Sequence, residues 1–226
     1  MPTIDHMPWE EFYPRFTSQW NQGEHVSLIG PTGTGKSTLG LMLLPRREWT
    51  VVLGTKPEDP TLRKLRKEGF ARMATWTPKP TQHKVLLWPP IRSEEDMALQ
   101  RAVFRQAIAQ IYKEGRWCLF VDELRYICEE LKLARMMRLL WLQGRSNKIT
   151  LVGVCQRPAF VPTEMYDQAT HLFFWCDNDE RNLKRIGGIG WLNAKLIREA
   201  VAKLPFHHVL YINTRKGTML TTKAKV

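Results

Sequence analysis

Short apolar runs alternate with longer amphipathic stretches along most of this chain. Runs rich in Val, Ile, Leu and Phe are typical of strands buried on both faces of a parallel sheet. They fall at residues 26–29, 50–55, 84–88, 117–121, 149–155, 171–176 and 208–212. The stretches between them predict helices at 36–44, 61–69, 131–143, 180–186 and 191–203, and a long helix that begins at 93. Residues 216–223 are expected to form a strand in a C-terminal hairpin. This alternation indicates an α/β fold with a mostly parallel central sheet flanked by helices.

The first 23 residues differ from the rest because aromatic side chains dominate their apolar positions. Their spacing is that of a helix, and they are Trp9, Phe12, Tyr13, Phe16 and Trp20. We therefore expect an amphipathic N-terminal arm over residues 1–23, packed either on the body of the protein or on a neighbouring subunit.

A glycine-rich loop follows the first apolar run directly. It reads Gly30, Pro31, Thr32, Gly33, Thr34, Gly35, Lys36 and Ser37, and Thr38 continues into the predicted helix. A loop of this kind between a strand and a helix directs backbone N–H groups and the positive end of the helix dipole at a polyphosphate. In this pattern Lys36 reaches the β- and γ-phosphates and the Ser37 hydroxyl binds Mg²⁺. The sequence therefore predicts an ATP site, and residues 24–226 are expected to form one P-loop ATPase domain.

Two adjacent acids end the apolar run at residues 117–121. Asp122 is expected to hold Mg²⁺, and Glu123 to polarise a water for attack on the γ-phosphate. The alternative is that the pair only ends a strand. Gln156 follows the run at 149–155, and its amide would face the γ-phosphate if that strand lies between the loop strand and the Asp-Glu strand.

An arginine from a neighbouring subunit could complete such a site. Arg145 lies in a polar turn before residues 149–155, and in a ring of subunits this edge could face the neighbour's nucleotide. Arg125, Arg138 and Arg157 compete with it for this role.

Net charge points to a polyanionic partner. Lys and Arg number 34 against 22 Asp and Glu, which gives a formal charge of +12. Nucleic acid or an acidic membrane surface would suit this excess, although solvated basic faces would also explain it. Cations concentrate in residues 56–84 and 181–203, and a loop from the first segment could track phosphates without reading sequence.

The remaining composition excludes several classes of protein. The four cysteines have no Cys-x-x-Cys spacing and no nearby His in zinc spacing, which argues against a disulfide framework or a metal centre built on them. We expect reduced thiols in a cytoplasmic protein, with Cys118 and Cys155 inside buried strands. No apolar run approaches membrane-spanning length, and no signal-peptide core is expected at the N-terminus.

Three blocks of the sequence resemble the FtsK–HerA superfamily of ring-forming, DNA-pumping ATPases. They are the loop at 30–37, the strand end at 119–123 and residues 144–158, which join an arginine turn, an apolar strand and a Gln-Arg-Pro end. The resemblance covers about residues 26–186 and is greatest to genome-packaging ATPases of viruses and phages. The stretch Asn147-Lys148 is not a close match to the chromosome-segregation translocases, and their DNA-sequence-reading module is absent from this sequence.

The resemblance implies a RecA-like P-loop NTPase of the ASCE class, in a homo-oligomeric hexamer or pentamer around double-stranded DNA. By position, Lys36 and Ser37 match the phosphate loop, Asp122 and Glu123 the metal and water site, Gln156 the sensor and Arg145 the trans-acting arginine. A capsid or portal protein is a further expected partner, and the expected location is the host cytoplasm or the virion. One alternative is an ATPase that drives protein assembly or secretion, and another is a small-molecule kinase.

Overall fold

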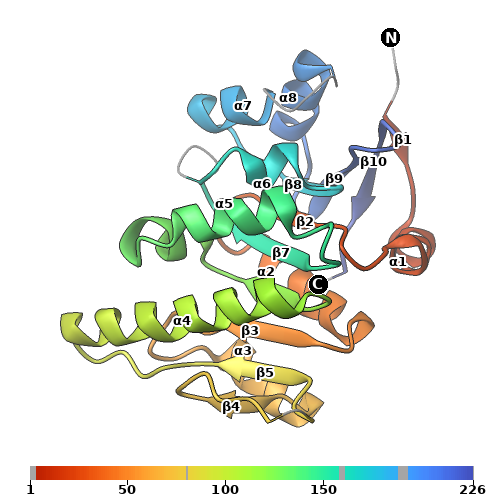
Figure 1. Ribbon diagram of the computed structural model, residues 1–226. Helices are drawn as coiled ribbons and strands as arrows, with labels where there is room; N and C mark the ends of the chain where they lie inside the picture. The colour runs from red at the N-terminus through yellow and green to blue at the C-terminus, as the bar shows by residue number, and fades with distance from the viewer. Residues whose placement is uncertain (1–3, 80, 158–160, 188–192, 226) are drawn as a thin grey trace.

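The computed structural model places one ten-stranded sheet between two layers of helices (Figure 1). It describes residues 4–79, 81–157, 161–187 and 193–225. The strands are β1 (Asp5–His6), β2 (Val26–Ile29), β3 (Thr50–Leu53), β4 (Ala71–Met73), β5 (Lys84–Leu87), β6 (Cys118–Val121), β7 (Thr150–Cys155), β8 (His171–Trp175), β9 (His208–Asn213) and β10 (Thr218–Lys223). The α-helices are α1 (Trp9–Gln19), α2 (Lys36–Leu43), α3 (Pro60–Lys64), α4 (Glu94–Glu114), α5 (Ala134–Gln143), α6 (Glu164–Asp167), α7 (Glu180–Gly187) and α8 (Ala194–Ala202). Short 3₁₀ turns η1 (Leu44–Arg46) and η2 (Leu65–Glu68) and a π-helical turn η3 (Tyr126–Glu130) complete the elements.

The sheet is parallel through its centre and antiparallel near one edge. Its strand order is β1-β10-β9-β8-β2-β7-β6-β3-β5-β4. Neighbouring strands from β8 to β4 are parallel, whereas β9 runs antiparallel to both β8 and β10. The expected mostly parallel sheet and the expected C-terminal hairpin are both confirmed.

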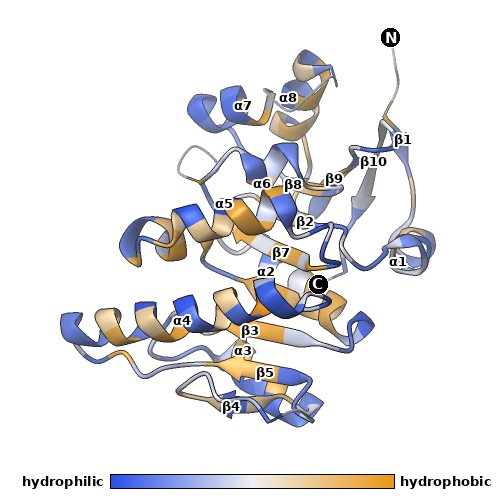
Figure 2. Ribbon diagram, viewed as in Figure 1, coloured by the Kyte–Doolittle hydropathy of each residue, from blue (hydrophilic) through white to orange (hydrophobic). Residues whose placement is uncertain are grey.

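Two apolar cores lie on opposite faces of this sheet. Successive side chains of a strand point to opposite faces, and on β3 Val51 and Leu53 join one core while Val52 joins the other. The first core packs under α4, α5 and α8, and the second under α1, α2 and α3. Figure 2 shows β3 and β5 as strongly hydrophobic ribbons, as expected for strands covered on both sides.

The aromatic helix α1 packs on the sheet of its own chain. Phe16 is buried, with its ring centroid 5.2 Å from that of Phe173 on β8 and 5.7 Å from that of Tyr211 on β9. Phe12 makes similar edge contacts with the same two rings. The division of the chain into an arm at 1–23 and a domain at 24–226 stays a prediction.

Several elements were not predicted, and each lacks a periodic apolar signal. The edge strand β4 has partly exposed Ala71 and Met73 around an exposed Arg72, and β1 has only two residues. The turn η3 occupies residues before α5, so that helix begins at Ala134 rather than at 131. Pro158 and positions 191–192 of the predicted helix at 191–203 lie outside the described residues. No helix in the described ranges is long and apolar enough to cross a membrane.

Candidate nucleotide site

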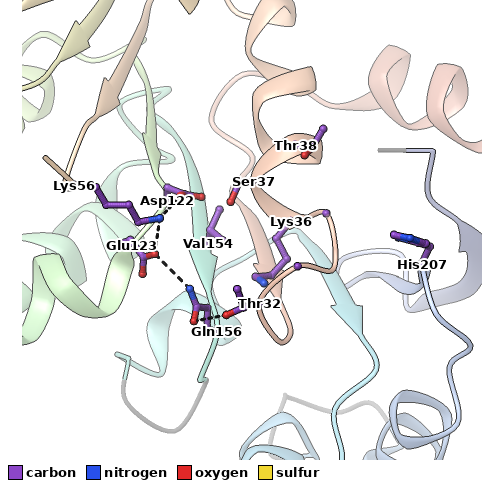
Figure 3. A pocket seen from close by; sticks show the side chains of 12 residues that line it. Thr32, Lys36, Ser37, Thr38, Lys56, Asp122, Glu123, Val154, Gln156 and His207 are labelled. Carbon is purple, nitrogen blue, oxygen red and sulfur yellow. Dashed lines mark hydrogen bonds and ion pairs between the residues drawn. The ribbon is translucent and has the colours of Figure 1, made fainter. Parts of the chain in front are cut away.

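The glycine-rich loop turns between β2 and α2 as the sequence predicts. Gly33 and Gly35 have φ angles of +80° and +96°, a region that glycine enters without the strain a Cβ would add. Gly35 is also the N-cap of α2, so the first amides of this helix follow it immediately. A cleft of about 310 Å³ opens at this point and is lined by Thr32, Gly33, Gly35, Lys36, Ser37, Thr38, Lys56, Asp122, Glu123, Val154, Gln156 and His207 (Figure 3).

Lys36 is held inside the loop rather than in solvent. Its side chain is buried, and the ammonium donates to the carbonyl of Pro31 and lies 3.5 Å from the hydroxyl of Thr34. Burial lowers the pKa of Lys36, and the negative charge of Asp122 opposes this shift. A desolvated ammonium beside the N-terminus of α2 is suited to an anion with several negative charges.

Asp122 provides a buried carboxylate on the opposite wall of the cleft. It follows β6 directly and is 7% exposed. Its Oδ1 atom makes no hydrogen bond within the described part of the chain. Burial raises the pKa of Asp122, although the Ser37 hydroxyl and Lys56 oppose the shift. A carboxylate oxygen without a partner, next to a serine hydroxyl, fits a hard cation that takes its other ligands from phosphate and water.

A chain of hydrogen bonds crosses the mouth of the cleft from Thr32 to Glu123. The Thr32 hydroxyl donates to the Gln156 side-chain oxygen at 2.9 Å, and the Gln156 amide donates to Glu123 Oε1 at 3.3 Å (Figure 3). The sheet order explains this arrangement, because β7 lies between β2 and β6. The structural condition for Gln156 to face the site is therefore met, while its role as a sensor stays a prediction.

Lys56 belongs to the site, and sequence reasoning assigned it only to a basic segment. Its ammonium lies 3.1 Å from Glu123 Oε1, 3.7 Å from Asp122 Oδ2 and 3.9 Å from Asp59 Oδ2. Burial alone would lower the pKa of Lys56, but the three carboxylates together raise it. The one feature of the sequence that could have assigned Lys56 to the site is its position just after an apolar run. That position becomes informative only when β3 is known to pair with β6.

Arg145 lies at the other end of the sheet from this cleft. It is exposed in the turn between α5 and β7, and its carbonyl is close to Gly23. The six residues of β7 separate this turn from Gln156, a distance of roughly 20 Å at the rise of a strand. Arg145 therefore cannot reach the cleft of its own chain, and only its predicted action on a neighbouring subunit remains open. Of its competitors, Arg138 pairs with Glu164 and Arg125 with Glu129.

None of the four cysteines lines the cleft. All four are free thiols; Cys118 and Cys155 are buried inside strands, as expected, and burial raises the pKa of each to about 12. No group of three or more His, Cys, Asp or Glu side chains in the described ranges could hold a metal ion by itself.

Comparison with known proteins places the fold among P-loop NTPases. Neither protein-family models nor curated protein sequences match this chain. Among solved structures, it is similar to the genome packaging NTPase B204 from Sulfolobus turreted icosahedral virus 2 in complex with AMPPCP, at 15% identity and a TM-score of 0.65, over 91% of this chain and 100% of that one. It is also similar to VirB4 of Thermoanaerobacter pseudethanolicus, at 11% identity and a TM-score of 0.64, over 90% of this chain and 89% of that one.

A third similar structure is longer than this chain. It is EccC (ATPases 2 and 3) of Thermomonospora curvata in complex with a signal sequence peptide, at 14% identity and a TM-score of 0.57, over 92% of this chain and 37% of that one. Identities this low support the fold and not the activity. The resemblance to viral packaging ATPases that the sequence indicated is confirmed at the level of the fold, which is that of a P-loop NTPase.

Proposed function

We propose that this chain binds ATP at the glycine-rich loop and hydrolyses it. The observation that carries this proposal is the hydrogen-bonded chain of Thr32, Gln156 and Glu123 across the mouth of a cleft that also holds Lys36. In this arrangement the loop amides and Lys36 bind the phosphates, and Glu123 accepts a proton from the attacking water. Gln156 contacts both the loop and Glu123, which supports the proposal that it senses the γ-phosphate.

Mg²⁺ is the cation that the residues suit best. Ser37 and Asp122 would hold it, directly or through water, together with oxygens of the bound phosphates. When bound, it neutralises charge that develops on the phosphates during hydrolysis. The unpartnered Oδ1 of Asp122 is the feature that supports this assignment.

The work that hydrolysis drives is proposed to be movement of double-stranded DNA. The net charge of +12 supports this, as does a row of exposed cations on α3 and η2, namely Arg63, Lys64, Arg66 and Lys67. The similar protein B204 is a genome packaging NTPase. We propose that five or six copies form a ring, that Arg145 acts on the neighbour's nucleotide, and that a capsid or portal protein is a further partner.

The proposal is tested by measuring ATP hydrolysis with and without duplex DNA at low salt. We expect DNA to stimulate hydrolysis in the wild type and not in the triple variant K64Q/R66Q/K67Q. A matched control removes three exposed cations from α4, as R101Q/R105Q/K113Q, and should keep the stimulation. DNA affinity should also fall steeply with salt, with a slope that decreases by about 0.9 for each phosphate contact removed. Equal rates with and without DNA would count against translocation while leaving the ATPase assignment standing.

One observation favours a second candidate, an ATPase that acts on a protein. The similar structure of EccC was solved with a signal sequence peptide. In that case a peptide or protein, rather than duplex DNA, would raise the hydrolysis rate. The same assay distinguishes the two functions, because K64Q/R66Q/K67Q should then hydrolyse ATP at the wild-type rate when a peptide or protein is added.

A further inference from the structure

The turn between α8 and β9 carries two neighbouring aromatic rings at the edge of the proposed ATP site. From their position we infer that Phe206 and His207 form the contact surface for the base of the nucleotide, with His207 against the base and Phe206 extending the surface. This inference rests on the proposed function, because it concerns the same cleft. It identifies a binding element that neither the motif nor the resemblance indicated.

The two ends of the cleft differ in chemistry, and this gives a bound nucleotide a direction. Glu123, Gln156 and Lys56 lie together at one end, where hydrolysis of the γ-phosphate would occur. His207 lies beyond Lys36 at the other end (Figure 3). A nucleoside triphosphate with its terminal phosphate at Glu123 therefore extends its sugar and base toward His207.

His207 is the one ring among the described residues that line the cleft. The other lining side chains are small, aliphatic, charged or amide groups, which hold phosphates and cations but offer no face for stacking. Bases stack on aromatic side chains irrespective of their hydrogen-bonding pattern, because every base has a π-face. Among the described residues that line the cleft, His207 is therefore the one side chain on which a base could stack.

The backbone at His207 adopts the left-handed conformation. Its φ angle is +61°, a region that few residues other than glycine enter and that histidine, asparagine and aspartate enter most readily. The carbonyl of His207 accepts a hydrogen bond from the Ala224 amide at 2.9 Å, which ties the turn to the end of β10. Arg116, Lys132 and Lys148 also have positive φ angles but do not line the cleft. The position of His207 in the cleft therefore matters here, and the hydrogen bond to Ala224 keeps it there.

Phe206 presents a large apolar ring at the surface of the same turn. At 72% exposure it is the most exposed large apolar side chain in the described ranges. Its ring centroid lies 4.0 Å from that of His207, and its carbonyl accepts from His208 Nδ1 at 3.2 Å. Phe206 does not line the cleft itself, but its ring contacts the imidazole of His207 at an interplanar angle of 54°, so a base that reaches past His207 would meet it.

The test compares ATP with inorganic tripolyphosphate, which has the phosphates of ATP but no base. Binding of each with Mg²⁺ is measured by calorimetry for the wild type and for Phe206→Ala and His207→Gly. Glycine suits the φ of +61°, and Phe206 is exposed, so both variants should fold. A control variant, Leu99→Ala, removes another exposed apolar side chain from α4, far from this turn in sequence.

We expect each variant to bind ATP roughly tenfold more weakly than the wild type, with tripolyphosphate binding unchanged and the control unaffected. Unchanged ATP affinity in both variants would overturn the inference. An equal loss for ATP and tripolyphosphate would also overturn it, because the rings would then act on the loop and not on the base. If the wild type bound neither ligand, the proposed nucleotide site itself would be wrong.

Discussion

Replacing Lys56 by glutamine tests whether one positive charge stabilises the acids of the site. Its ammonium lies within 3.1 Å of Glu123 and 3.7 Å of Asp122. Glutamine keeps much of the length and can still form hydrogen bonds, but it has no charge. The buried carboxylate of Asp122 would then lack one of its two nearby ammonium groups, leaving Lys36.

The size of the stability loss in K56Q follows from the distance between Lys56 and Glu123 and from the exposure of the Lys56 side chain. For the contact with Glu123, Coulomb's law gives about 1 kcal/mol in water and about 5 kcal/mol at an effective dielectric constant of about 20. The Lys56 side chain is 46% exposed, so solvent screening places the value toward the lower limit. We expect K56Q to lower the free energy of unfolding by about 1–2 kcal/mol near neutral pH.

The pH dependence of this difference has a definite sign. The carboxylates raise the pKa of Lys56 above its ordinary value of 10.5, because they stabilise its charged form. A raised lysine pKa adds stability that is complete below the unfolded value and is lost as the pH rises through the folded value. The gap between wild type and K56Q should therefore be constant near neutrality and close in strong alkali.

The assay is urea unfolding followed by tryptophan fluorescence, with and without excess Mg²⁺. A divalent cation at Asp122 supplies positive charge where Lys56 is missing, so Mg²⁺ should stabilise K56Q more than the wild type. Lys195→Gln is the control, since the Lys195 side chain is 80% exposed and pairs only with the 53% exposed Glu199 on α8 in the described ranges; it should change stability by no more than about 0.5 kcal/mol. A loss in K56Q as small as in the control, or one that Mg²⁺ leaves unchanged, would refute the reasoning.

Three further predictions concern other parts of the molecule. Gly40→Ala should lower the free energy of unfolding, measured by urea titration, by about 1–3 kcal/mol, because the added Cβ would lie 2.4 Å from the Phe120 ring. Asp122→Asn should raise Tm in the absence of Mg²⁺, since burial raises the Asp122 pKa and its charge destabilises the fold at neutral pH, and it should abolish Mg²⁺-dependent hydrolysis. His25 is buried, and its Nδ1 accepts a hydrogen bond from the Leu151 amide. Burial lowers the pKa of His25 to about 4. Stability should therefore fall by about 3 kcal/mol between about pH 6.5 and 4, and His25→Gln should remove this part of the pH profile.

The sequence predicted the central sheet because its strands are buried on both faces. Such strands are continuous apolar runs that need no knowledge of their partners, as at Cys118–Val121 and Thr150–Cys155. Edge strand β4 was not predicted, because one of its faces meets solvent and an arginine occupies its middle position. The helix start at Ser93 was equally clear from the three acids that follow it, and in the structure Asp96 closes a capping box with Ser93.

The site was predicted as far as its residues lie in contiguous motifs. The loop, Asp122 and Glu123 could each be assigned to the site from the residues next to them in the sequence. Lys56 does not, because its role depends on β3 lying beside β6 and on both strands ending at the same edge. His207 was missed for the same reason, since a turn 171 positions after Lys36 (207 − 36) reaches the cleft only through the antiparallel return of β9.

The most direct test of the account is a single-turnover measurement with Glu123→Gln. This variant should bind ATP with nearly the affinity of the wild type, because the loop and Lys36 are intact. Its rate of hydrolysis should fall by about 10²–10⁴-fold, the usual contribution of a general base. The control Glu199→Gln, on the exposed face of α8, should hydrolyse ATP at the wild-type rate. Trapped, unhydrolysed ATP is the result the account predicts, and undiminished turnover in Glu123→Gln would contradict it.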